Sequence, residues 1–120
     1  MSSSTGGAWE RAVVAYLQAA GFPEAYRSRG SEGPRDIGDV LGFARWALDC
    51  KDQAKISLGS WVGQVNNEAR NLQAALGAVI VKRRGKPAED AFVVMDLATW
   101  VKLEIYIDEL TKEIRDDGTG

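Results

Sequence analysis

The stretch 37-IGDVLGFARWALDCKDQ-53 decides the fold that this sequence predicts. Residues 37–42 and 45–51 are two short, largely apolar runs separated by a tight turn near Gly42. Such runs with a glycine between them are typical of two neighbouring β-strands. Because the gap is so short, an antiparallel hairpin is the simplest connection between them.

The second of these strands carries a row of polar side chains. Alternate residues of a strand face the same side, so Asp49, Lys51 and Gln53 are expected on one face. Leu48 and Cys50 then point the other way, into the core. A carboxylate, an amine and an amide in a row on one strand face is an unusual arrangement.

Helices and further strands are expected on both sides of this hairpin. Apolar residues at helical spacing, and the glycines that follow them, indicate three helices. Short apolar runs bounded by turn residues indicate three more strands. The expected helices are 8–20, 61–76 (ended by Gly77) and 97–114, and the further strands are 25–30, 78–81 and 91–95.

The expected fold class is α/β, with a mixed five-stranded sheet flanked by helices in the order α-β-β-β-α-β-β-α. The 120 residues fit a single domain over 8–115. Residues 1–7 and 116–120 are expected to be flexible tails. The apolar stripe of the third helix is expected to pack on the sheet of its own chain, with a dimer contact as the alternative.

Composition excludes several classes of chemistry. The chain has no His and one Cys, which excludes a Ser-His-Asp triad, a His-ligated zinc, a Cys₄ site and an intrachain disulfide. Catalysis would have to use carboxylates, amines, hydroxyls, the lone thiol or a metal held by oxygen. A free Cys and no signal-peptide or membrane-spanning pattern indicate the cytoplasm and no membrane partner.

Charge is distributed unevenly along the chain. Residues 25–86 contain eleven Lys and Arg against six Asp and Glu, whereas 87–120 contain three against nine. The formal net charge of −2 hides this division. A basic middle segment is a candidate surface for nucleic acid, and the acidic third helix would face away from it.

Two carboxylates on the hairpin could form a metal site. Asp39 on one strand and Asp49 on the next can lie near each other at one end of the sheet, and Asp36 is a second candidate for the first acid. Close carboxylates repel unless a cation sits between them or one binds a proton. Mg²⁺ prefers oxygen ligands, which Asp39, Asp49 and the backbone carbonyl of Cys50 could supply. Lys51 could then orient a metal-bound water or stabilise charge on the phosphorus centre.

This pattern resembles the PD-(D/E)xK nuclease superfamily. Within it, the chain is most similar to the archaeal Holliday junction resolvases and related phage resolvases. The resemblance covers roughly residues 8–96 and implies a restriction-endonuclease-like core. It rests on five stretches: Trp9-Glu10-Arg11, 26-YRSRGS-31, Gly38-Asp39-Val40, 49-DCKDQ-53 and 82-KRRGK-86.

The resemblance also implies roles for individual residues. Asp39 and Asp49 would hold Mg²⁺ (or Mn²⁺), Lys51 would be the catalytic lysine, and Glu10 would add a ligand or a water contact. Gln53 and Gln64 would support the site. The candidate DNA contacts, some of them proposed from charge alone, are Arg27, Arg29, Ser31, Arg35, Lys55, Lys82, Arg83, Arg84 and Lys86.

The expected activity is metal-dependent hydrolysis of phosphodiester bonds in branched DNA by a homodimer that makes paired nicks in a four-way junction. Two alternatives stay open: another nuclease of the same superfamily (flap, nicking or DNA-end processing), and a catalytically silent DNA-binding subunit. The sequence departs from the superfamily pattern at two positions. Asp49 stands in place of the commoner Glu, and Gly38 in place of a Pro before the first acid.

Overall fold

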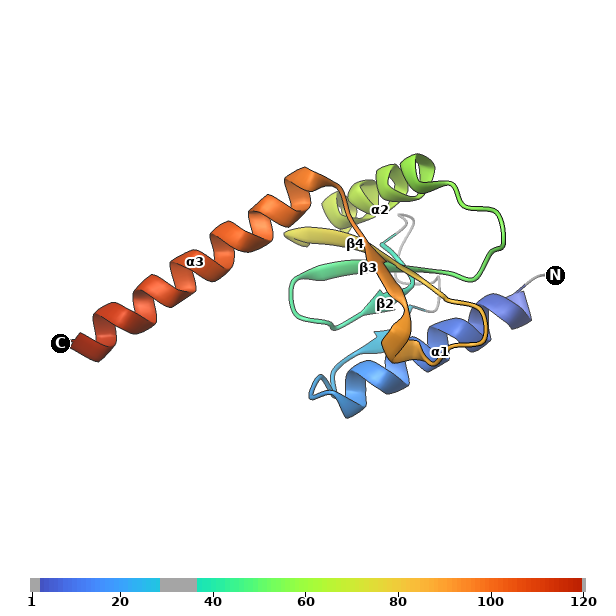
Figure 1. Ribbon diagram of the computed structural model, residues 1–120, viewed down its shortest axis with the longest axis horizontal. Coiled ribbons are helices and arrows are strands. Elements are labelled where there is room, and N and C mark those ends of the chain that lie inside the picture. The colour runs from blue at the N-terminus through green and yellow to red at the C-terminus, as the bar shows by residue number, and fades with distance from the viewer. Residues whose placement is uncertain (1–2, 29–36, 120) are drawn as a thin grey trace.

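A five-stranded mixed sheet forms the centre of the computed structural model, which describes residues 3–28 and 37–119 (Figure 1). The strands follow one another across the sheet in the order β1-β2-β3-β4-β5. Only β3 and β4 are parallel, and the other neighbours are antiparallel. The elements in chain order are α1 (Ser3–Ala19), β1 (Tyr26–Arg27), β2 (Val40–Leu41), β3 (Trp46–Lys51), α2 (Leu58–Leu72), β4 (Leu76–Val81), the short 3₁₀ helix η1 (Ala88–Asp90), β5 (Phe92–Val94) and α3 (Leu97–Thr119). The expected α/β class, with a mixed five-stranded sheet and flanking helices, is confirmed.

Helices α1 and α2 cover opposite faces of the sheet (Figure 1). On the α1 face, Trp9 and Val13 pack with Leu48 and Cys50 of β3. On the α2 face, a separate cluster contains Trp61, Val65, Val79 and Val81. Successive strand residues therefore enter different clusters, because the side chains of a strand alternate between its two faces.

The end of α2 and the start of β4 differ from the sequence-based prediction. The helix ends at Leu72, where Gln73 adopts the left-handed conformation (φ 60°) and its N–H caps the carbonyls of Ala69 and Arg70. The expected helical end, residues 76–77, instead begins β4. A Cβ on Gly77 would lie 2.9 Å from the carbonyl oxygen of Val65. Gly77 thus lets α2 approach the sheet closely and does not end the helix.

The first and last helices extend into the two segments that were expected to be tails. Helix α1 begins at Ser3, inside the segment expected to be a tail, and α3 continues to Thr119. An α-helix is held by hydrogen bonds of its backbone, whether or not its side chains are apolar. A segment of Ser, Thr and Gly can therefore extend the helix that follows it. Gly7 is buried, with the guanidinium groups of Arg11 and Arg27 beside it.

Helix α3 projects from the sheet and lengthens the molecule to 58 Å along its longest axis (Figure 1). Its first turn is fixed by Asp96, which accepts hydrogen bonds from the Thr99 N–H (2.8 Å) and from the Asn66 side chain (2.8 Å). The Arg45 guanidinium lies over the Tyr106 ring, 4.4 Å from its centre. The prediction that the α3 stripe packs on the sheet of its own chain is wrong, because most of its apolar side chains are exposed, including Trp100 (51 %) and Ile114 (72 %).

Among the described residues, no helix has the length and the apolar character needed to cross a bilayer.

Candidate functional site

Asp39 is held between two strands by its backbone and its side chain. Strands β2 and β3 pair antiparallel with Val40 opposite Leu48, as the hairpin prediction required. The Asp39 N–H donates to the Leu48 carbonyl (2.8 Å), and the Asp39 carbonyl accepts from the Ser28 N–H (2.9 Å). The Asp39 carboxylate accepts a 2.8 Å hydrogen bond from the Cys50 N–H through Oδ2. These bonds fix the first acid against the strand that carries the second.

Asp49 and Lys51 lie on the α2 face of β3, as the alternation of the strand predicts. Asp49 is paired in register with Val79, and Lys51 with Val81, and both valines belong to the cluster under α2. Asp49 is only 2 % exposed, whereas Lys51 is half-buried at the end of the strand. The second acid therefore lies inside the fold, and the lysine lies where solvent begins.

Gly38 explains one departure from the superfamily pattern. Its φ is +100°, a value that proline cannot adopt and that other L-residues rarely adopt. A Cβ at this position would lie 3.0 Å from the Leu48 carbonyl oxygen and 3.6 Å from Asp49 Oδ1. Glycine therefore follows this backbone path, which places Asp39 against β3, without the strain that a Cβ would add.

The electrostatic field at Asp39 is unfavourable to its charged form. Burial above all, together with the neighbouring charges of Asp49 and Glu10, raises the pKa of Asp39 to about 6. The Cys50 N–H and the Lys51 ammonium act in the opposite direction. Burial likewise raises the pKa of the Cys50 thiol far above its usual value, which makes this thiol a poor nucleophile. The field at Asp39 is one that a bound cation would relieve.

Glu10 is engaged by Arg27. Glu10 Oε1 lies 3.0 Å from Nη2 of Arg27 and accepts a 3.1 Å hydrogen bond from its Nε. Among residues 3–28 and 37–119, no group of three or more His, Cys, Asp or Glu side chains could hold a metal ion. Glu10 therefore influences Asp39 through its charge and does not complete a three-carboxylate cluster with Asp39 and Asp49.

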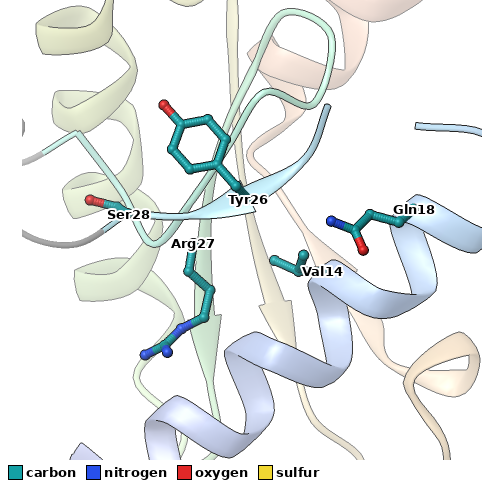
Figure 2. Close-up of a pocket in the computed structure, with 5 residues that line it drawn as sticks. All are labelled: Val14, Gln18, Tyr26, Arg27 and Ser28. Carbon is teal, nitrogen blue, oxygen red and sulfur yellow. The ribbon is translucent and has the colours of Figure 1, made fainter. Parts of the chain in front are cut away.

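A cavity of about 470 Å³ lies beside this ion pair, between α1 and β1. It is lined by Val14, Gln18, Tyr26, Arg27 and Ser28 (Figure 2). Figure 2 shows Arg27 directed from β1 towards α1, whereas Tyr26 points to the opposite side of the strand. Gln18, one of the lining residues, donates a hydrogen bond to the Ala25 carbonyl (2.9 Å). Arg27 thus has a polar opening beside it as well as its carboxylate partner.

The basic turn that follows β4 lies next to Lys51. The Lys82 N–H donates to the Lys51 carbonyl (2.9 Å), because β3 and β4 are parallel and end side by side. Lys82 also forms a long ion pair with Asp52 (3.9 Å) and faces the Trp9 ring. The Arg83 guanidinium lies 4.9 Å from the centre of the Phe92 ring. The other candidate DNA contacts that the structure describes are exposed: Lys55, Arg84 and Lys86.

The remaining predicted site residues lie in the loop after β3, on α2 or outside the described residues. Gln53 is exposed in the loop after β3, and Gln64 donates to Glu68 (3.1 Å). Arg29, Ser31, Arg35 and the alternative first acid Asp36 lie outside the described residues.

Sequence reasoning missed Glu68, which is 2 % exposed on α2. Its position offered a signal. Trp61, Val65, Glu68 and Leu72 share the helical spacing of the buried stripe, so one carboxylate falls among apolar positions. A buried carboxylate is costly unless it has polar partners, and Gln64 supplies one of them.

Comparison with protein-family models, curated proteins and solved structures gives no match to this chain.

Proposed function

We propose that this chain is a metal-dependent DNA endonuclease of the PD-(D/E)xK type that resolves four-way DNA junctions. The observation that carries the proposal is the hydrogen bond from the Cys50 N–H to Asp39 Oδ2. It ties the first acid to the strand segment that bears Asp49 and Lys51, the other two members of the D…(D/E)xK pattern. The restriction-endonuclease-like core and membership of the superfamily are part of this proposal.

The donor set suits a hard divalent cation. Asp39, Asp49 and the Cys50 carbonyl offer only oxygen, which Mg²⁺ and Mn²⁺ accept. Burial and like charges already penalise an ionised Asp39, and these are conditions that favour cation binding. When bound, the metal would supply Lewis-acid activation of a phosphodiester and a more acidic water.

Three side chains of the protein would have separate roles beside the metal. The Lys51 ammonium, at the solvent-facing end of β3, would stabilise negative charge that develops on the attacked phosphate. Asp49, buried beside it, would orient the cation. Arg27, held by Glu10 at the edge of the sheet, would contact a neighbouring phosphate. A fixed guanidinium loses less conformational entropy on binding a phosphate than a free one does.

The charge distribution supports DNA as the substrate. The turn over 82–86 carries four basic residues and adjoins Lys51, so a phosphate backbone there would run past the lysine. The acidic helix α3 projects away from the sheet (Figure 1). Such a surface recognises backbone shape and charge more than base sequence. Symmetric nicks in two strands need two sites, so the proposed active species is a homodimer.

The test is cleavage of an end-labelled mobile four-way junction in Mg²⁺ by wild type, Asp49→Asn and Lys51→Met. We expect paired symmetric nicks from wild type and a decrease in rate of about a hundredfold or more in each variant. The matched controls are Asp108→Asn and Lys112→Met, an exposed acid–lysine pair on α3 (3.2 Å), which should cleave normally.

Three outcomes would contradict parts of the proposal. Cleavage at the wild-type rate by both Asp49→Asn and Lys51→Met would overturn the assigned site. Efficient cleavage of flaps or linear duplex without paired nicks would favour another nuclease of the superfamily. Tight junction binding by wild type, with no cleavage in Mg²⁺ or Mn²⁺, would favour a silent DNA-binding subunit.

A further inference from the structure

The indole ring of Trp61 lies under the Lys51 side chain. Lys51 Nζ is 5.8 Å from the centre of the ring, within the range at which a cation is attracted to an aromatic face. Trp61 is 5 % exposed and packs with Val65, Val79 and Val81 between α2 and the sheet. Its backbone N–H donates to the Ser57 carbonyl (3.0 Å), which fixes the first turn of α2. The ring is therefore a rigid surface.

Lys51 meets that surface at the half-buried end of β3. The ion pairs among the described residues do not include Lys51, although Asp39 interacts with its charge. A lysine ammonium is a point charge on a flexible four-carbon stem. An aromatic face on one side of the strand attracts the ammonium towards that side, which is the side on which Asp49 lies.

We propose that Trp61 is a positioning residue: its ring holds the Lys51 ammonium at the site by a cation–π contact. The proposal rests on the nuclease function proposed above, in which Lys51 acts on the phosphate. Trp61 itself is too buried to contact the substrate, so its effect would pass through Lys51.

Trp9 provides a matched comparison within the same chain. Lys82 Nζ also lies 5.8 Å from the centre of its ring, and Trp9 is likewise buried. Lys82, however, also pairs with Asp52, and it lies on the turn that follows β4. Weakening the cation–π contact between the Trp9 ring and Lys82 should therefore leave the rate of the chemical step unchanged.

The test replaces Trp61 by mono-, di- and trifluorotryptophan through nonsense suppression and measures single-turnover cleavage of the junction at saturating DNA. Fluorine withdraws charge from the ring face and changes its shape little, so a cation–π contact weakens stepwise. We expect the rate to fall stepwise, by about three- to tenfold over the series, with an unchanged DNA concentration at half-saturation. The same series at Trp9 should give a flat rate.

A second measurement does not depend on activity. The ammonium resonance of Lys51 in ¹⁵N-labelled protein should be shifted by the ring current of Trp61. This shift should disappear in Trp61→Leu and survive in part in Trp61→Phe, the variant that should also retain more activity.

The outcomes separate the two proposals. A flat rate across the Trp61 series, with cleavage still abolished in Lys51→Met, would overturn the positioning role and leave the nuclease function intact. An unshifted Lys51 resonance in wild type would overturn it as well. Absence of Lys51-dependent cleavage, together with a ring-shifted resonance, would overturn the nuclease function and, with it, the catalytic purpose of the contact.

Discussion

The Asp39 carboxylate accepts its hydrogen bond from the Cys50 main chain, on β3, the neighbouring strand (2.8 Å). A side chain from the edge of β2 thus takes the place of a backbone partner of β3, and it lies in the field of Asp49 and Glu10. The pairing of β2 with β3 at this bond therefore depends on the charge of the Asp39 carboxyl, and this dependence can be measured.

Ionisation of Asp39 should make the metal-free protein less stable as pH rises. Its pKa is raised from 3.8 to about 6 by folding, so the folded state holds the proton more tightly than the unfolded state. The resulting stability is fully present below pH 3.8 and is lost as pH rises through about 6. The free energy of unfolding, measured by urea titration in EDTA, should decrease more steeply with pH over this range for wild type than for Asp39→Asn. Equal slopes in the two proteins would contradict this assignment.

Added Mg²⁺ should reverse that trend if the two acids hold the cation. Binding to the ionised form lowers the apparent pKa of Asp39 and stabilises the folded state at neutral pH by mass action. The midpoint of unfolding at neutral pH should therefore rise with Mg²⁺ concentration in wild type and stay constant in Asp49→Asn. A rise of the same size in both proteins would indicate binding elsewhere.

Gly38→Ala should destabilise the protein by about 1–3 kcal/mol. The added Cβ meets the Leu48 carbonyl at 3.0 Å, and φ is +100° at this position. Denaturant unfolding measures the decrease. Gly63→Ala, within α2 and with no atom near its Cβ position, is the control, and it should leave stability unchanged or raise it. Equal effects at the two glycines would argue against the strained approach of β2 to β3.

Asp96→Ala should loosen the start of α3. Asp96 caps the Thr99 N–H and binds Asn66 on α2, and removal of an N-cap costs about 1 kcal/mol. Hydrogen exchange of the amides over 97–103 should accelerate. Hydrogen bonds from Thr99, and then from Asn66, lower the pKa of Asp96. In wild type, the protection of the amides over 97–103 against exchange should therefore decrease as pH falls towards and below that pKa. Asp108→Ala, further along α3, should change exchange over 97–103 very little.

Removal of charge from the turn after β4 should weaken DNA binding without a sequence preference. The Arg84→Ala/Lys86→Ala variant lacks two exposed cations of the turn that begins at Lys82, the residue bonded to the Lys51 carbonyl. The slope of log affinity against log salt should decrease by about one for each phosphate that the variant no longer neutralises. Fluorescence anisotropy with a labelled junction, at salt concentrations between about 50 and 200 mM, measures this slope. Lys112→Ala on α3 should bind as wild type does, and a comparable weakening there would indicate a diffuse electrostatic effect.

The pattern of side chains along β3 made much of the site predictable. Alternation separated Asp49 and Lys51 from Leu48 and Cys50, and the short gap near Gly42 predicted the hairpin that brings Asp39 to β3. These features depend on local geometry, which a few neighbouring residues determine. Membership of the superfamily, the metal and the junction substrate stay predictions.

Long-range contacts account for what the sequence did not reveal. Leu76 and Gly77 continue an apolar helical pattern, yet they belong to β4, because the left-handed cap at Gln73 ends α2 earlier. The ion pair between Glu10 and Arg27, seventeen residues later, was also not expected; the role of Glu10 as a ligand or water contact stays a prediction. Neither outcome follows from periodicity, since each depends on which element packs beside the segment.

The sequence by itself determined the α/β class, the hairpin and the face that carries Asp49 and Lys51, because alternation and turn chemistry act over a few residues. The tertiary structure decided the parallel pairing of β3 with β4 and the position of the basic turn next to Lys51. It also decided the Trp61 ring under that lysine and the projection of α3 away from the sheet. These relationships depend on packing between segments far apart in the chain, where burial and close approach select the partner.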